Sequence, residues 1–167
     1  MASCWPNVAV DEVPAAGSVW LFDVDGCLID SLTGSSLRPL ARELLGRLDA
    51  AGHTIVAWSA GGAAHAERVM TPHDVVELID AFYDKDGRDG ADRWRLDHLA
   101  AEHRPDVCVD DRPEDAPSGV TTIAVSPYLA PDLHDRGLQP ALDAIGGAAP
   151  PPPELGGVRL SRVTLRP

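Results

Sequence analysis

The chain has 167 residues, a length that fits one domain, and 44% of them are hydrophobic, which is enough for one core and argues against disorder throughout. Its 26 acidic and 14 basic residues give a formal net charge of −12, which disfavours nonspecific binding to nucleic acid. The sequence opens without a signal-like segment, contains no membrane-length apolar run and has three cysteines without metal-type spacing, so we expect a cytoplasmic protein with reduced thiols and no membrane insertion.

From Ser18 to Ala124, short apolar runs alternate with longer segments of helical periodicity. The expected strands are 18–22, 54–58, 81–84, 107–109 and 121–125. The expected helices are 37–51, 63–70, 72–80, 92–103 and 131–145. This alternation is typical of strand–helix–strand units, and it predicts an α/β fold, a Rossmann-like three-layer sandwich around a central, mainly parallel sheet.

The chain divides into three parts by composition. Residues 1–17 form a lead-in, 18–145 form the core, and 146–167 begin with a Gly- and Pro-rich run that predicts an extended linker. Residues 158–165 alternate like a terminal strand, which could pair with a sheet edge of its own chain or of a second chain. A homo-oligomer is therefore one expectation.

Polar side chains stand where the expected strands end. They are Asp23 and Asp25 after the first strand, Ser59 after the second, Lys85 after the third, and Asp110 and Asp111 after the fourth. Because the carboxyl ends of parallel strands share one edge of a sheet, where ligands bind in such folds, we expect these side chains to form one site.

The first of these groups is the run Asp23-Val24-Asp25-Gly26. Carboxylates at i and i+2 on a strand end point to the same side, so Asp23 and Asp25 could serve one reacting centre in different roles. Gly26 would permit a tight turn with positive φ directly after them. The same pattern also fits a solvated acidic loop or a calcium-type turn.

Asp110 and Asp111 would face the first group across the sheet edge. Facing carboxylates repel one another unless a cation neutralises them, and oxygen ligands without a histidine cluster favour magnesium over zinc. The alternative is that these two residues cap a helix or form a surface turn. The sequence thus predicts a Mg²⁺ site that includes Asp23, Asp25, Asp110 and Asp111.

Lys85 and Ser59 are candidates for holding a phosphate. Lys85 is the only lysine among the 14 basic residues, and it would act as a compact point charge, or else lie exposed beside its acidic neighbours. Ser59 and the backbone amides of the turn from Ala60 would donate to phosphate oxygens, or Ser59 would simply cap a helix. The six histidines lack ligand spacing, and we expect them on helix surfaces.

Taken in order, Asp23-x-Asp25-Gly26, Ser59, Lys85 and Asp110-Asp111 resemble the four motifs of the haloacid dehalogenase-like superfamily, over roughly residues 18–127. Local similarity is to its capless branch, with the carboxy-terminal-domain and magnesium-dependent phosphatases. The resemblance implies that Asp23 is a nucleophile and that Asp25 is the acid and base. It implies Mg²⁺ between Asp23, the Asp25 backbone carbonyl and Asp111, with Asp110 close by, and phosphoryl oxygens on Ser59 and Lys85. Within this superfamily, the presence of Asp25 indicates an enzyme that cleaves a phosphate ester rather than a carbon–halogen bond.

The gaps between the motifs are too short for a large cap domain, and residues 27–39 could form a small hairpin with its turn near Thr33-Gly34-Ser35. The leading expectation is a phosphatase for a small phosphorylated metabolite. One alternative is a phosphoprotein phosphatase that uses the same open site. Another is a catalytically silent interaction module that binds a partner through its tail.

Overall fold

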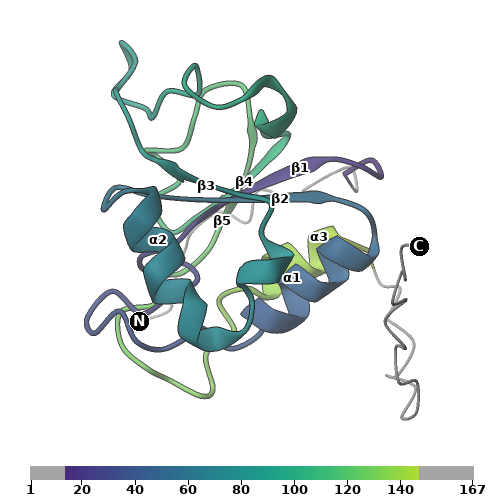
Figure 1. Ribbon diagram of the computed structural model, residues 1–167, viewed down its shortest axis with the longest axis vertical. Helices are drawn as coiled ribbons and strands as arrows, with labels where there is room; N and C mark the ends of the chain where they lie inside the picture. The colour runs from purple at the N-terminus through teal and green to yellow at the C-terminus, as the bar shows by residue number, and fades with distance from the viewer. Residues whose placement is uncertain (1–13, 147–167) are drawn as a thin grey trace, which may run out of the picture.

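A central parallel sheet organises the molecule, whose structure, a computed structural model, describes residues 14–146 (Figure 1). Its five strands have the order β3-β2-β1-β4-β5. They are β1 (Val19–Asp23), β2 (Thr54–Ser59), β3 (Ala81–Asp84), β4 (Val107–Asp110) and β5 (Thr121–Ala124). The predicted α/β, Rossmann-like class is confirmed, and each predicted strand is found within one residue of its expected bounds. The terminal strand predicted at 158–165 lies outside the described residues.

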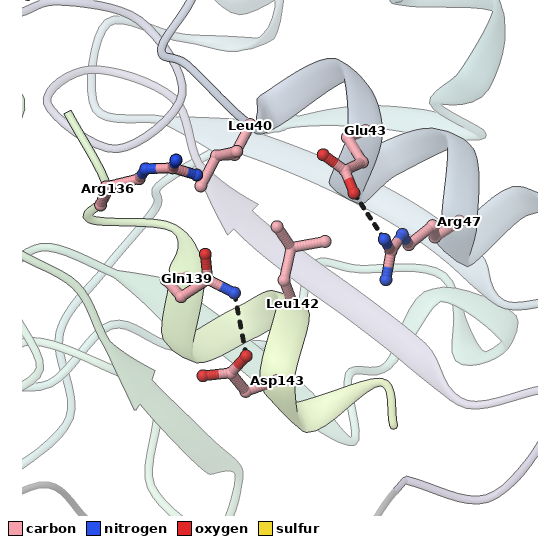
Figure 2. A pocket seen from close by; sticks show the side chains of 7 residues that line it. All are labelled: Leu40, Glu43, Arg47, Arg136, Gln139, Leu142 and Asp143. Atoms are coloured by element: carbon pink, nitrogen blue, oxygen red, sulfur yellow. Dashed lines mark hydrogen bonds and ion pairs between the residues drawn. The ribbon is translucent and has the colours of Figure 1, made fainter. Parts of the chain in front are cut away.

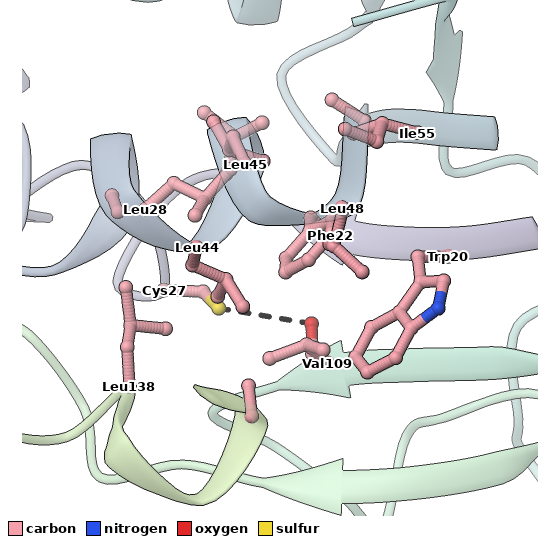
Figure 3. Close-up of a cluster of buried hydrophobic side chains, with 14 of the residues drawn as sticks. Trp20, Phe22, Cys27, Leu28, Leu44, Leu45, Leu48, Ile55, Val109 and Leu138 are labelled. Carbon is pink, nitrogen blue, oxygen red and sulfur yellow. Dashed lines mark hydrogen bonds between the residues drawn. The ribbon is translucent and has the colours of Figure 1, made fainter. Parts of the chain in front are cut away.

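Three α-helices cover one face of the sheet (Figure 1): α1 (Ala41–Ala50), α2 (Ala63–Met70) and α3 (Gln139–Ala144). Trp20 and Phe22 of β1 point to this face, and they lie under Leu44, Leu45 and Leu48 of α1 (Figure 3). These side chains are fully buried, because the apolar face of α1 packs on the apolar side chains that β1 directs to this face of the sheet.

The opposite face of the sheet is covered by irregular chain rather than by regular helices (Figure 1). Leu21, Val56 and Trp58 form a second, smaller core there, against Trp94 and Leu96. The fold therefore has three layers, of which one is built largely from the loops that follow β3 and β4.

The helix predicted at 92–103 is wrong, and tertiary contacts explain why. Only the 3₁₀ helix η3 (Ala101–His103) forms in this stretch. The N–H of Trp94 donates to the carbonyl of Asp115 at 3.1 Å, and Trp94 also bridges to Arg88. Asp92 has φ 61°, a left-handed value that a helix interior does not accept. The long-range contacts of Trp94 thus override its local helical pattern.

Three other helices are shorter than predicted. Residues 72–80 form 3₁₀ turns η1 (Thr71–His73) and η2 (Val76–Leu78), with Asp74 left-handed between them. α1 begins at Ala41 rather than at Leu37, because Leu37 pairs with Ile29 across a hairpin and Leu40 has φ 72°. The segment predicted as helix 131–145 is helical only in α3, and Asp135, which precedes α3, is paired with the buried Arg38.

The hairpin at residues 27–39 forms as predicted, and the described residues contain no large inserted domain. Its turn is closed by the buried carboxylate of Asp30, which accepts from the backbone N–H groups of Thr33, Ser35 and Ser36 and from the Thr33 hydroxyl. Although burial opposes ionisation, these donors together lower the pKa of Asp30 to about 2.

No helix in residues 14–146 is long and apolar enough to cross a membrane.

Arg38 ties this hairpin to the chain that follows β5. Its side chain is fully buried and pairs through Nε and Nη2 with both carboxylate oxygens of Asp135, at 2.5 and 3.1 Å. Nη2 also donates to the carbonyl of Ser126 at 2.7 Å, and Nη1 donates to that of Cys27 at 3.3 Å. The guanidinium lies against Gly137 so closely that a Cβ there would overlap it. One buried cation therefore fixes three backbone segments.

We expect Arg38→Met to lower the free energy of unfolding by roughly 3 kcal/mol, because the change leaves Asp135 and two buried carbonyls without their partner. The control is Arg47→Met, which removes a partly exposed pair with Glu43 on α1 and should cost at most about 1 kcal/mol. Urea unfolding followed by circular dichroism measures both. Equal losses in the two variants would contradict this role of Arg38.

Candidate active site

Parallel pairing brings the predicted site residues to one edge of the sheet. Asp23 stands opposite Trp58 across β1 and β2, and Ser59 stands opposite Asp84 across β2 and β3. On the other side, β1 pairs with β4, so that the chain order reverses between these two central strands. The carboxyl ends of the strands at such a switch point are where ligands bind in open α/β sheets.

Lys85 lies at the centre of this edge, as the residue that follows β3. Its Nζ is 2.8 Å from Oδ1 of Asp23 and 3.2 Å from Oδ2 of Asp110, and all three side chains are buried. The indole rings of Trp58 and Trp94 lie 5.1 and 5.7 Å from the same ammonium group. The alternative of an exposed lysine is therefore wrong, and the predicted meeting of Asp23, Lys85 and Asp110 is found.

Asp111 completes a cluster of three carboxylates with Asp23 and Asp110, in which one oxygen from each lies within 4.8 Å of the others. Asp111 comes close to the backbone of Gly26, where a Cβ would stand 2.9 Å from its Oδ2. Gly26 has φ 88°, as the expected tight turn requires. Gly26 thus leaves the room that the carboxylate of Asp111 occupies, and Asp110 is buried rather than a surface turn residue.

The electrostatics of the cluster are unbalanced, since one ammonium group faces three carboxylates. Burial and the neighbouring carboxylates raise the pKa of Asp23 to about 8, although Lys85 acts against this rise. Burial also raises the pKa of Asp110. The carboxylates of Asp23 and Asp110 in turn raise the pKa of Lys85 despite its burial, which keeps it a cation. A divalent cation with a preference for oxygen ligands fits this excess of negative charge.

Asp25 lies outside this cluster and in a different environment. Its side chain is 35% exposed, its Oδ2 accepts from the hydroxyl of Ser59 at 2.6 Å, and its Oδ1 is 2.8 Å from Nε2 of His65. The predicted metal set therefore divides: the side chains of Asp23, Asp110 and Asp111 come together, and the side chain of Asp25 does not join them. Coordination through the Asp25 backbone carbonyl stays a prediction.

Ser59 is buried at the end of β2, where its hydroxyl donates to Asp25 and accepts from the N–H of Gly61 at 2.9 Å. The alternative that Ser59 caps α2 is wrong, because the N-cap residue is Gly62. Ala60 lies exposed in the turn between β2 and α2. Phosphate binding by Ser59, Ala60 and Lys85 stays a prediction, with the difference that the Ser59 hydroxyl is here bound to Asp25.

His65 is the site residue that the sequence did not reveal. His65 lies on a helix surface, as expected, with its side chain 29% exposed, and it also reaches from the first turn of α2 to Asp25. A signal was present in Gly61, because a Cβ at that position would stand 2.8 Å from Cδ2 of the imidazole. A glycine pair followed by a histidine at a helix start beside a strand end could have indicated the contact.

A groove between α1 and α3 is separate from this edge (Figure 2). It has a volume of about 280 Å³, and none of its lining residues is a predicted site residue. Its walls carry the pair Glu43–Arg47 on α1 and the bond from Gln139 to Asp143 on α3. The groove offers no carboxylate cluster and no buried cation.

No family model and no curated protein matches this chain. Four chains of solved structures match, among them one from the Pnkp1/Rnl/Hen1 RNA repair complex. The identity to that chain is 16% and the TM-score is 0.43, over 72% of this chain and 46% of the other. The present chain thus spans less than half the length of that protein, and a similarity at this level does not bear on its activity.

We expect Mg²⁺ to raise the melting temperature more at about pH 8.5 than at about pH 6. With the pKa of Asp23 raised to about 8, the metal-free folded state binds a proton that the unfolded state has lost above about pH 4, so its stability falls as the pH rises through this range. A metal ion must displace this proton, which costs less at high pH. Thermal melting with and without Mg²⁺ measures the difference.

The variant that tests the location of the metal is Asp111→Asn, which removes the most accessible carboxylate of the cluster. We expect this variant to lose most of the Mg²⁺-dependent shift at about pH 8.5. A shift that is independent of pH, or unchanged in Asp111→Asn, would contradict metal binding at these carboxylates.

Proposed function

We propose that this chain is a Mg²⁺-dependent phosphomonoesterase that hydrolyses a small phosphorylated metabolite through an aspartyl-phosphate, in the manner of the haloacid dehalogenase-like phosphatases that its motifs resemble. The observation that carries the proposal is the buried contact of Asp23 with the single lysine, at a strand edge where two further aspartates converge. The four motif positions occupy neighbouring strand ends, which supports one shared site.

Asp23 is the proposed nucleophile. One of its carboxylate oxygens attacks phosphorus, the new bond from Asp23 to phosphorus forms, and the bond from phosphorus to the ester oxygen breaks. Burial removes water from this carboxylate and Lys85 holds its Oδ1, so the attacking group has a fixed orientation. Water then attacks the phosphorus of the aspartyl-phosphate, and release of inorganic phosphate restores Asp23.

Asp25 is the proposed acid and base. In the first step its carboxyl gives a proton to the departing alkoxide, and in the second step its carboxylate takes a proton from the attacking water. The partial exposure of Asp25 and its bonds to Ser59 and His65 give it surroundings distinct from those of Asp23, two residues earlier. Two carboxylates with unlike environments suit these unlike roles.

Magnesium would be held by Asp23, Asp110 and Asp111, and when bound it would neutralise charge on the phosphoryl oxygens. Lys85 would contribute a second positive charge to the same oxygens. Ser59 would donate to them if its hydroxyl turned from Asp25 to the phosphoryl group.

The substrate class that we propose is a small phosphorylated metabolite. The described core has no inserted cap, and the net charge of −12 disfavours a nucleic-acid substrate. An open site could also admit a phosphorylated side chain of a protein. A panel of about a hundred phosphorylated metabolites and several phosphopeptides, assayed for phosphate release, decides between these classes. Turnover of phosphopeptides alone would overturn the metabolite assignment.

We expect Asp23→Asn to lower the turnover of an aryl phosphate by at least about 10³-fold, because an amide cannot form the acyl phosphate. The control is Asp49→Asn on the exposed side of α1, which should retain turnover within about twofold. Full activity of Asp23→Asn would contradict its role as nucleophile. A wild-type protein without Mg²⁺-dependent hydrolysis would favour the catalytically silent interaction module.

A further inference from the structure

Both carboxylate oxygens of Asp25 are engaged by other side chains. Ser59 donates to Oδ2 at 2.6 Å, and Nε2 of His65 lies 2.8 Å from Oδ1. These contacts come from different elements, since Ser59 ends β2 and His65 belongs to α2. A carboxylate held at both oxygens has one orientation instead of several, and nothing in the motif pattern accounts for the contact from His65.

The position of His65 is itself fixed by the start of α2. The backbone N–H of Ala63 donates to Oδ1 of Asp84, which anchors the first turn of the helix to the end of β3. The imidazole then lies against Gly61, where a side chain would collide with it. The anchored first turn of α2 and the close contact with Gly61 therefore direct this ring toward Asp25.

Arg68 determines which nitrogen of the ring carries the proton. Its Nη2 is 2.9 Å from Nδ1 of His65. A guanidinium has donors and no acceptor, so Nδ1 must be the acceptor in this bond. The proton of the neutral ring is then on Nε2, which donates to Oδ1 of Asp25. Arg68 and His65 thus form a chain of donors that ends at Asp25, whose Oδ1 accepts.

We propose that His65, set by Arg68, is a positioning residue that orients the carboxyl group of Asp25 for proton transfer to the leaving oxygen, a role that it keeps when the Ser59 hydroxyl turns to the phosphoryl group. The inference rests on the proposed function, because it gives His65 a role through Asp25 and not through contact with the substrate. Loss of His65 leaves Asp25 with only the Ser59 hydroxyl, which turns to the bound phosphoryl group, so the carboxyl group can rotate away from the ester oxygen.

The effect of losing the His65 contact on the reaction rate depends on the leaving group. An alkoxide is a strong base and cannot leave without a proton, whereas 4-nitrophenolate leaves readily without one. The value of kcat/KM reports the steps through the first phosphoryl transfer, in which this proton moves. A fault in the orientation of Asp25 should therefore appear in kcat/KM for alkyl phosphates and much less in that for 4-nitrophenyl phosphate.

The test compares His65→Leu with His65→Gln on the full chain in the presence of Mg²⁺, using 4-nitrophenyl phosphate and an alkyl phosphate that the wild type hydrolyses. We expect the Leu variant to lose about 10²-fold in kcat/KM on the alkyl phosphate and at most about threefold on the aryl phosphate. The Gln variant, whose Nε2 can donate in place of that of the imidazole, should recover most of the loss. The control Glu67→Gln, exposed on the same helix, should match the wild type.

Thermal melting checks that the variants fold. If the Leu variant melts early, Arg68→Met provides the second test, since it keeps the imidazole and removes only the donor to Nδ1, and we expect a smaller loss with the same preference for the alkyl substrate. Equal losses on both substrates, or no rescue by Gln, would overturn the inference and leave the proposed phosphatase standing. A wild-type protein that hydrolyses neither ester would overturn both.

Discussion

The buried contact of Lys85 with Asp23 and Asp110 is the interaction on which the arrangement of this sheet edge depends. Two carboxylates and an ammonium group have left water, and none of the three would be stable there without the others. The contact joins the central strands β1 and β4 to the end of β3, which is separated from β4 by two strands. Trp58 and Trp94 enclose the ammonium, so the irregular layer that contains Trp94 also forms part of the site.

Much of the fold could be predicted because central strands of a parallel sheet are buried on both faces. Such strands are continuous apolar runs, and β1 and β2 show this in the sequence. Helices were harder to predict, since helical periodicity was present where tertiary contacts decide the outcome. Trp94 illustrates this: its backbone donates to Asp115, distant in sequence, and its ring covers Lys85.

Part of the candidate site could be predicted from the ends of the strands. The part that could not be predicted also has a physical reason. Asp23, Lys85 and Asp110 directly end or follow strands, so the topology alone brings them together. His65 lies on a helix, and its direction depends on where α2 starts and how it crosses the sheet. The turn at Gly61 and Gly62 sets both, and the bond from Ala63 to Asp84 fixes them. No pattern of spacing between His65 and Asp25 encodes that geometry.

The charge of the carboxylate cluster also constrains the order of events under the proposed function. Lys85 is the one cationic side chain among residues 14–146 that pairs with these carboxylates, and it is already shared between two of them. A phosphate monoester brings roughly two further negative charges near neutral pH. Its approach to the cluster of Asp23, Asp110 and Asp111 is unfavourable until a divalent cation has displaced the proton of Asp23 and offset the negative charge. Under the proposed function, the buried lysine would hold the folded edge together, whereas substrate binding would require the metal.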